Sequence, residues 1–191
     1  MNEPASSSRP RLELQPEMQN TPVHLERPDR TWPERFAAEA AVIKGVLGDQ
    51  AVAIEHVGST SVQGIYAKPI IDIAVAVVSF DEVPKCVEPL GRIGYEYVPE
   101  FESTLPNRRY FRKDSPEGIR THHVHMYEKG HVEFVEYLLF REYLRRHADA
   151  ARDYERLKQD LAARLGRRDY TAAKAPFIRS VIDRARAEGL L

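Results

Sequence analysis

The sequence predicts an α+β (mixed α/β) fold, in which one helix precedes a mixed β-sheet and the last third of the chain is helical. Two observations support this prediction. Short β-branched segments separated by Pro, Asn and Gly occupy the middle of the chain, and apolar residues recur at helical spacing from residue 131 onward. The 191 residues suffice for one core of ordinary size and are too few for two comfortable domains.

The N-terminal 21 residues are rich in Pro, Ser and mixed charge and show no hydrophobic period. Such a segment cannot bury enough apolar surface to order itself. We therefore expect residues 1–21 to be a flexible leader and residues 22–191 to form the folded domain.

A first helix is expected to begin at Thr31. Thr31 can cap the helix, Pro33 is tolerated in its first turn, and Glu34 stands three residues after Thr31, as in a capping box. Gly48 is expected to end the helix. One face should pack inward through Phe36, Ala40, Ile43 and Leu47.

The segments that follow predict the sheet. Residues 51–57 are expected to form a strand, which leads into the small-residue turn at residues 58–61. Lys68 precedes Pro69 and is therefore expected to be extended. The β-branched run at residues 70–78 is typical of a strand buried on both faces, although Asp72 interrupts it.

Further elements follow along the chain. Asp81 can cap a helix that runs to about Leu90. Three more strands are predicted at residues 95–98, 108–112 and 121–127, joined by loops that contain Pro, Asn and Gly. The helical third begins at His131, and its inward positions are expected to be Phe134, Leu138, Arg141 and Leu144, then Tyr154, Leu157, Leu161 and Leu165, then Phe177, Ile178, Val181, Ile182 and Ala185.

Charge and composition limit the kinds of partner. The formal net charge is −1, whereas a protein that wraps nucleic acid usually has a basic excess, so nucleic acid is not an expected partner. No apolar stretch approaches the ~20 residues of a membrane span, and the N-terminus does not resemble a signal peptide. Cys86 is the only cysteine, which favours a reducing compartment. A soluble, cytoplasmic protein of undetermined oligomeric state is expected.

The most specific motif lies at residues 54–73, which read IEHVGSTSVQGIYAKPIIDI. This stretch resembles the signature of the GrpB family, which is roughly IEHIGSTSVPGL.AKPIIDI. Two shorter stretches add to the resemblance. Residues 140–145 (FREYLR) are similar to the LLFRDYLR helix of the family, and residues 170–178 (YTAAKAPFI) are similar to its YT..K..F element. Together the similarities extend from about residue 22 to residue 187.

The resemblance implies a fold of the nucleotidyltransferase superfamily. In that superfamily a Gly-Ser turn follows one strand, and the next strand carries two carboxylates two residues apart. The turn can hold a triphosphate, and carboxylates at positions i and i+2 share one face of a strand and can bind Mg²⁺. Gly58 and Ser59 match the turn and Asp72 matches the first carboxylate, but Ala74 replaces the second. This departure argues against ordinary two-metal nucleotidyl transfer.

Asp72 is the expected catalytic and metal-binding residue. An ionised carboxylate in an apolar strand is costly unless it is paired, hydrogen-bonded or bound to a metal. The sequence leaves two solutions open. One is a salt bridge to Lys68 or to an arginine of the facing strand, and the other is a bound ligand or metal ion.

The remaining ligand-binding candidates surround the same motif. Gly58, Ser59 and Ser61 could donate hydrogen bonds to phosphate oxygens, or could serve only as turn formers. Lys68 could neutralise a phosphate, or could be an exposed lysine at the start of a strand. Lys174, in the stretch similar to the YT..K element, could close the pocket.

Four arginines flank two strands expected near the site, and guanidinium groups bind phosphate in bidentate fashion. One or two of them are expected to contact the ligand, and Arg109 is the chosen candidate. The four residues are Arg108, Arg109, Arg112 and Arg120.

His123 and His125 place two imidazoles on one face of a predicted strand, because strand side chains alternate. With Asp72 across the sheet they would form a site of two histidines and one carboxylate, which favours Mn²⁺, Fe²⁺ or Zn²⁺ over Mg²⁺. The alternative is that both histidines are structural or at the surface.

These observations predict a nucleotidyltransferase-like protein that binds a nucleoside triphosphate or a related phosphorylated ligand with a divalent metal, Mg²⁺ or Mn²⁺. The acceptor is not identified by the sequence. One alternative is a nucleotide-binding accessory module without catalysis, which Ala74 favours. Another is a metal-dependent phosphoesterase that uses Asp72, His123 and His125.

Overall fold

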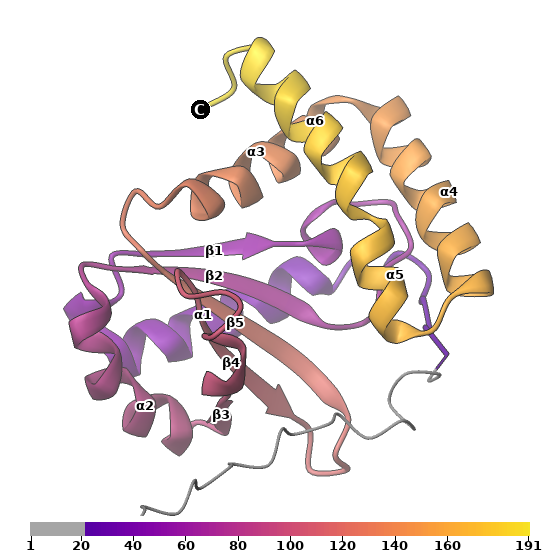
Figure 1. Ribbon diagram of the computed structural model, residues 1–191. Coiled ribbons are helices and arrows are strands. Elements are labelled where there is room, and N and C mark those ends of the chain that lie inside the picture. Colours follow the sequence, from indigo (N-terminus) through magenta and orange to yellow (C-terminus); the bar gives the residue numbers. More distant parts are fainter. Residues whose placement is uncertain (1–21) are drawn as a thin grey trace, which may run out of the picture.

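The computed structural model describes residues 22–191, so the predicted leader lies outside the described residues. Five strands form one mixed sheet in the order β1-β2-β5-β4-β3, flanked by helices on both faces (Figure 1). The main elements are α1 (Trp32–Leu47), β1 (Ala53–Val57), β2 (Ile71–Val77), α2 (Val83–Arg92), β3 (Tyr95–Tyr97), β4 (Arg109–Asp114), β5 (Arg120–Glu128), α3 (Val132–Arg146), α4 (Ala148–Arg164), α5 (Arg167–Ala173) and α6 (Ala175–Ala187).

The sheet is parallel between β2 and β5 and antiparallel between its other neighbouring strands. The predicted α+β class is therefore confirmed, and the predicted strands lie within two residues of the observed ones. None of the helices in the part of the chain that the structure describes is long and apolar enough to cross a membrane.

The interior strand β2 contributes side chains to the packed layers on both faces of the sheet. Its residues Ile71, Ile73, Val75 and Val77 are buried in the core that also contains side chains of α1 and α2. Its residues Ala74 and Ala76 pack instead toward Phe134 of α3. Because strand side chains alternate, Asp72 shares the face of Ala74 and is directed to the side of the C-terminal helices.

Two predicted helix caps are wrong, because nearby residues take their place. The Thr31 side chain makes no cap hydrogen bond to α1, so there is no capping box with Glu34. Instead, Asp29 accepts hydrogen bonds from the Thr31 N–H and the Thr31 hydroxyl, each at 2.8 Å. Before α2, the hydroxyl of Ser79 accepts from the Asp81 N–H at 3.2 Å and caps the short 3₁₀ helix Phe80–Glu82, and the N-cap residue of α2 is Glu82 rather than Asp81.

The C-terminal third is helical, as predicted, and packs around its own apolar cluster. Its inward positions in α3 differ from the predicted set, because α3 is buried against both the sheet and α6. Arg141 is among the predicted positions, yet it donates to the carboxylate of Glu55 and to the carbonyl oxygen of His56, each at 2.8 Å. The buried side chains of α3 are Phe134, Leu139, Phe140, Tyr143 and Leu144.

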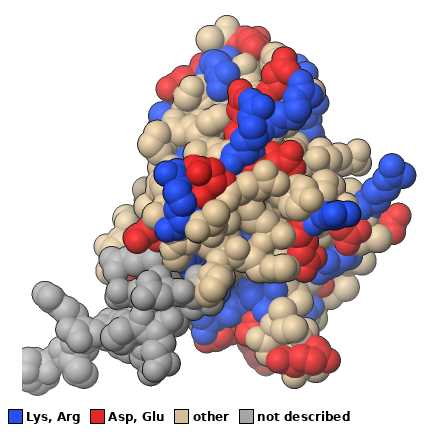
Figure 2. Space-filling view, turned by 90° about the vertical axis from the view of Figure 1, so that its right-hand side faces the viewer, with Lys and Arg blue, Asp and Glu red and all other residues tan. Residues whose placement is uncertain are grey.

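The outer face of the C-terminal helices carries interleaved charges of both signs (Figure 2). On α4 several arginines pair with an aspartate one turn earlier, including Arg152 with Asp149 and Arg156 with Asp153. Exposed pairs of this kind contribute little to stability, but they neutralise the surface locally. The charges that bear on function lie elsewhere, at the junction between these helices and the sheet.

Candidate functional site

The turn between β1 and β2 folds back over Asp72. Val57, the last residue of β1, is opposite Asp72 in the antiparallel register, and Gly58 follows with φ +70°. A Cβ atom on Gly58 would lie 2.5 Å from Asp72 Oδ2. Only glycine therefore allows the backbone to approach the carboxylate this closely. The turn continues as a short 3₁₀ helix at Ser59–Ser61.

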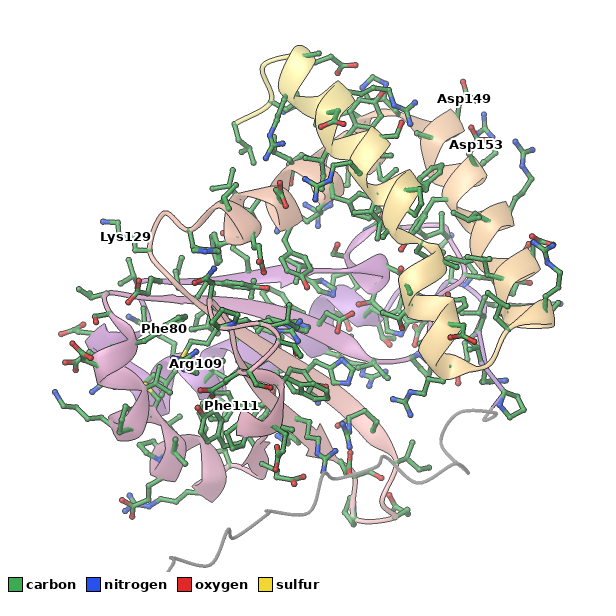
Figure 3. The ribbon with its side chains drawn as sticks, in the orientation of Figure 1. Phe80, Arg109, Phe111, Lys129, Asp149 and Asp153 are labelled. Atoms are coloured by element: carbon green, nitrogen blue, oxygen red, sulfur yellow. The ribbon has the colours of Figure 1, made fainter. Side chains whose placement is uncertain are left out.

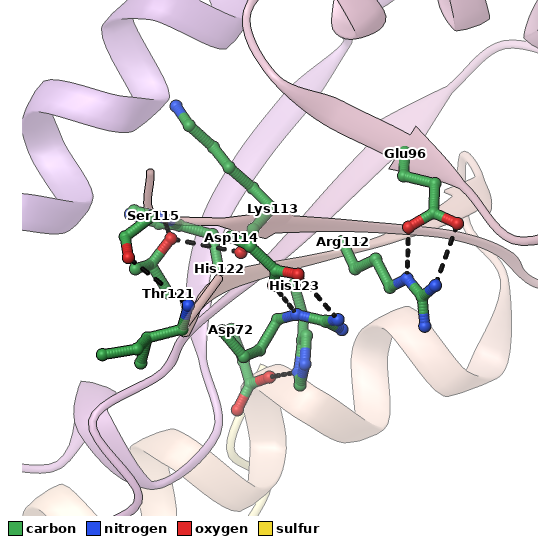
Figure 4. A network of polar contacts seen from close by, with 11 residues as sticks. Asp72, Glu96, Arg112, Lys113, Asp114, Ser115, Thr121, His122 and His123 are labelled. Carbon is green, nitrogen blue, oxygen red and sulfur yellow. Dashed lines mark hydrogen bonds and ion pairs between the residues drawn. The ribbon is translucent and has the colours of Figure 1, made fainter. Parts of the chain in front are cut away.

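Asp72 contacts two histidines of the neighbouring strand. The register of β2 and β5 pairs Asp72 with His123 and Ala74 with His125. Asp72 Oδ1 lies 2.9 Å from His123 Nδ1, a contact shown in Figure 4, and 3.5 Å from His125 Nε2. Within residues 22–191 neither Lys68 nor an arginine pairs with the carboxylate, so the salt bridge considered from the sequence is not formed there.

The two histidines hold Asp72 in its ionised form. Burial alone would raise the pKa of the carboxyl, but the hydrogen bonds and charges of His123 and His125 outweigh burial and keep that pKa well below its usual range. Burial conversely lowers the pKa of His125. The result is a carboxylate flanked by two imidazoles that are mostly removed from water.

This group of three residues fits a divalent metal ion. One ligand atom from each of Asp72, His123 and His125 lies within 4.8 Å of the others. Two imidazoles and a carboxylate are typical ligands of Mn²⁺, Fe²⁺ and Zn²⁺. Because Ala74 lies opposite His125, an imidazole stands near the position where a second carboxylate was expected. His123 Nε2 and His125 Nδ1 are buried without a hydrogen-bond partner among the described residues, which marks an incompletely satisfied polar site.

On its other side, Asp72 faces a small cavity with two lysines. The cavity has a volume of about 60 Å³ and is lined by Ser59, Thr60, Lys68, Ile70, Asp72, Tyr170 and Lys174. The Lys68 and Lys174 ammonium groups lie 4.7 and 4.6 Å from the ring centroid of the buried Tyr170. No carboxylate of residues 22–191 is within ion-pair distance of either lysine.

The environment of the two lysines disfavours their charged forms. Burial is the main cause that lowers the pKa of Lys68 to about 8, and the positive charges of Lys174 and Arg167 add to it. Burial also lowers the pKa of Lys174. Like charges held together in a poorly solvated place are stabilised by an anion, so the cavity suits a phosphate group.

Helix α4 positions the backbone that carries these groups. The Tyr66 N–H donates to Glu155 Oε1 at 2.8 Å, and the Tyr66 carbonyl oxygen accepts from Lys158. Lys158 is 1% exposed, and burial is the main cause that lowers its pKa to about 7. On the same helix, the Tyr154 hydroxyl lies 3.5 Å from Ser59 Oγ. Both the Ser59 turn and the segment before Lys68 are thus held by one helix.

Sequence reasoning missed this role of α4. The sequence predicts Tyr154 only as an inward packing residue and points to no role for Glu155 or Lys158. A signal was present, because Lys158 follows Tyr154 by four residues and therefore shares the otherwise apolar inward face. A lysine in such a stripe needs an internal hydrogen-bond acceptor, which is the Tyr66 carbonyl group.

Three predicted ligand-binding residues do not line the cavity: Gly58, which packs against Asp72, Ser61 and Arg109. The Ser61 hydroxyl donates to the Gly58 carbonyl oxygen at 2.6 Å, so Ser61 closes the turn. Arg109 lies 3.4 Å from Glu102 and stacks over Phe80 on the α2 side of the sheet (Figure 3). The reason is the strand parity, since Arg109 shares the face of the buried Phe111.

Comparison with known proteins identifies relatives across almost the whole described region. The model of the family "GrpB protein" matches residues 22–184. Over 132 residues the chain is 44% identical to UPF0157 protein YqkA of Bacillus subtilis, a match that covers 69% of this chain and 37% of YqkA. It is 41% identical to UPF0157 protein PA4798 of Pseudomonas aeruginosa, covering 83% of this chain and 66% of that protein. The chain thus spans about a third and about two thirds of these relatives.

Solved structures give the same picture of the fold. The crystal structure of the conserved protein GrpB from Enterococcus faecalis superposes with a TM-score of 0.76 at 36% identity, covering 88% of this chain and all of that one. Cid1 in complex with the UTP analogue UMPNPP superposes with a TM-score of 0.50 at 14% identity, covering 73% of this chain and 43% of Cid1. The second similarity concerns the fold alone, which is nucleotidyltransferase-like.

Proposed function

The chain belongs to the GrpB family, and from this premise we propose that it is a nucleotidyltransferase-type enzyme that binds a nucleoside triphosphate with a divalent metal ion. The observation that carries the proposal is the arrangement around Asp72. Two lysines without carboxylate partners line the cavity on one side of it, and two histidines complete a set of metal ligands on the other. Triphosphates and divalent ions are bound together in nucleotide enzymes, and this arrangement offers ligands to both.

Each residue has a defined part in the proposed reaction. Lys68 and Lys174 would bind the β- and γ-phosphates, and the Ser59 hydroxyl would donate to a phosphate oxygen. A divalent ion held by Asp72, His123 and His125 would neutralise phosphate charge. An acceptor oxygen would bond to the α-phosphorus and release its proton to solvent, while the bond to the β-phosphate oxygen breaks and pyrophosphate leaves toward the lysines.

A second candidate is a metal-dependent phosphoesterase, in which water replaces the acceptor. The observation that favours it is the ligand set. His125 faces Ala74, so the metal ligands are imidazoles where the nucleotidyltransferase pattern has a second carboxylate. Imidazole ligands favour the transition-metal ions Zn²⁺ and Mn²⁺ over Mg²⁺.

One experiment separates these functions. The metal-stripped protein would be titrated calorimetrically with Mn²⁺, Zn²⁺ and Mg²⁺, and then incubated with each α-³²P-labelled nucleoside triphosphate and the metal that binds. We expect binding of at least one nucleotide that depends on metal, and release of pyrophosphate when an acceptor mixture is added. The double substitution Lys68→Gln and Lys174→Gln should abolish nucleotide binding and leave metal binding intact.

The alternative outcomes are distinct. Release of orthophosphate or of a nucleoside monophosphate without an acceptor would indicate that the protein hydrolyses the nucleotide and does not transfer a nucleotidyl group. Nucleotide binding without any turnover would indicate the accessory module that Ala74 favours. If no nucleoside triphosphate binds in the presence of any of the three metals, the proposal is wrong.

The affinity for a nucleoside triphosphate should depend on pH through Lys68. With its pKa near 8, Lys68 is charged below that pH and loses its charge above it, so anion binding should weaken as the pH rises. We expect affinity to fall by about fivefold from pH 8 to pH 9, because the charged fraction of Lys68 falls by that factor. The ligand itself does not titrate in this window, because the second pKa of a phosphate is near 6. Calorimetric titration at constant ionic strength measures the effect.

The matched control for the pH dependence is Lys68→Gln, which should bind more weakly at pH 7.5 and lose most of the slope above pH 8. The stability of the ligand-free protein should follow the opposite trend. Because the pKa of Lys68 is lower in the folded state, the unfolded chain binds more protons between about pH 8 and pH 10.5, and stability rises with pH there. A wild-type affinity that stays constant across pH 7.5–9.5 would contradict the role of Lys68.

A further inference from the structure

Arg108 stands out among the arginines near the sheet, because its guanidinium group has no acidic partner. It directly precedes β4 and is half-buried, and its Nε is buried without a hydrogen-bond partner. None of the ion pairs formed within residues 22–191 includes Arg108. In contrast, Arg109 pairs with Glu102, Arg112 pairs with Glu96, and Arg120 pairs with Asp114.

The ring of Tyr110 lies between Arg108 and the two histidines of the metal-binding group. Its guanidinium carbon lies 5.5 Å from the centroid of the Tyr110 ring. The Tyr110 ring in turn lies 5.4 Å from the rings of both His123 and His125. The positive charge of Arg108 also acts on His125 and Tyr137, where it opposes the burial that raises the pKa of Tyr137.

Arg108 and the two lysines adjoin different parts of the site. The cavity with Lys68 and Lys174 adjoins the turn that connects β1 to β2, whereas Tyr110 lies on β4, beyond the histidines of β5. Since adjacent strands are about 4.8 Å apart, the step from β2 to β4 separates the two cationic places by roughly 10 Å across the sheet. A single phosphate cannot contact both.

A half-buried guanidinium group with an unpaired donor is costly unless an anion completes it. The ring of Tyr110 compensates the charge only in part, through a cation–π contact. The planar fork of an arginine matches the oxygens of a phosphate in bidentate fashion. Arg108 therefore has the properties of a second phosphate-binding residue.

We propose that Arg108 binds a phosphate group of the acceptor, so that the acceptor substrate is itself a phosphorylated molecule. The inference rests on the proposed function, because it takes the lysine side as the place of the triphosphate and of the leaving pyrophosphate. In phosphoryl and nucleotidyl transfer the attacking and leaving oxygens are roughly in line. The acceptor must then enter away from the lysines, and Arg108, which has no acidic partner among residues 22–191, lies near the histidines.

The test uses the neighbouring arginines as an internal comparison. The full-length protein would be treated with the arginine reagent phenylglyoxal, with and without orthophosphate, and labelling would be followed by peptide mass mapping. We expect Arg108 to react faster than the ion-paired Arg109. We also expect orthophosphate to slow the labelling of Arg108 by about tenfold, the size of one charge-assisted contact, and to leave Arg109 unchanged.

The same labelling in the double variant Lys68→Gln, Lys174→Gln separates this inference from the proposed function. Protection of Arg108 that persists in the variant supports a phosphate site distinct from the lysine cavity, even if no nucleotide binds to the wild type. Protection that disappears in the variant, or that is equal for Arg108 and Arg109, overturns the inference while leaving nucleotide binding by the lysines untouched.

A second measurement uses substitution instead of labelling. In the double variant Lys68→Gln, Lys174→Gln, the further substitution Arg108→Gln should weaken orthophosphate binding by about tenfold, measured by ³¹P line broadening, whereas Arg108→Gln alone should keep nucleotide affinity within twofold of the wild type. Arg109→Gln is the matched control and should leave phosphate binding unchanged. Equal loss in both variants would refute the assignment, and thermal unfolding would verify that both remain folded.

Discussion

Replacing Asp72 with asparagine is expected to lower the affinity for Mn²⁺ by about 100-fold or more, since even outer-shell substitutions cost metal sites up to that factor. Asparagine keeps the shape of the side chain but removes the charge that lies 2.9 Å from His123 Nδ1 and 3.5 Å from His125 Nε2. Calorimetric titration of Mn²⁺ into metal-stripped protein measures the change.

The same substitution separates the metal site from the phosphate site. Without metal, loss of the Asp72 charge removes a repulsion for anions near Lys68 and Lys174, so tripolyphosphate should bind at least as well as to the wild type. Asp81→Asn is the control, because Asp81 is exposed at the start of the α2 region and should change neither affinity. If Asp72→Asn binds Mn²⁺ with an affinity within twofold of the wild type, Asp72 is not a metal ligand and the proposed metal site is wrong.

Replacing Gly58 with alanine is expected to destabilise the protein and to disrupt the site together. The new Cβ would lie 2.5 Å from Asp72 Oδ2, in a backbone conformation of φ +70° and ψ −169° that is essentially restricted to glycine. Strain of this kind costs about 1–3 kcal/mol, and the contact with the carboxylate adds to it. The melting temperature should fall by about 5–15 °C, because 1 kcal/mol corresponds to about 2–4 °C for a chain of this size.

Gly64→Ala is the matched control for Gly58→Ala. Gly64 also has a positive φ, of +83°, but a Cβ there would meet nothing within 4 Å. It should therefore show the backbone strain without the clash, and keep metal affinity. If the two variants lose the same stability and both bind Mn²⁺ normally, the close approach of Gly58 to Asp72 has no importance for the site.

Much of the site could be predicted from the sequence, because its central residues lie on neighbouring strands with regular alternation. The pattern His-Val-His predicted two imidazoles on one face, and the structure brings both to Asp72. Ser59, Lys68 and Lys174 also meet at one cavity, as expected. Their roles in binding remain predictions.

The predictions differ from the structure where the position of a side chain depends on a single residue of strand register, or on a contact between residues far apart in the sequence. Arg109 is the arginine predicted to bind the ligand, but alternation along β4 places it on the α2 side, because a shift of one position changes the face of a strand residue. The contacts of α4 with Tyr66 join residues about 90 positions apart. No local sequence pattern indicates which buried carbonyl oxygen a buried lysine will donate to, so the contacts of α4 with Tyr66 could not be predicted.

The position of Tyr170 on α5 and of Lys174 between α5 and α6, after all five strands in the sequence, has a consequence for biosynthesis. A nascent chain that has left the ribosome only through β5 already contains Asp72, His123 and His125, but neither Tyr170 nor Lys174 has yet been added. Such an intermediate could bind a metal ion before it could hold a polyphosphate. Under the proposed function, the polyphosphate site would therefore be complete only after Tyr170 and Lys174 have been added.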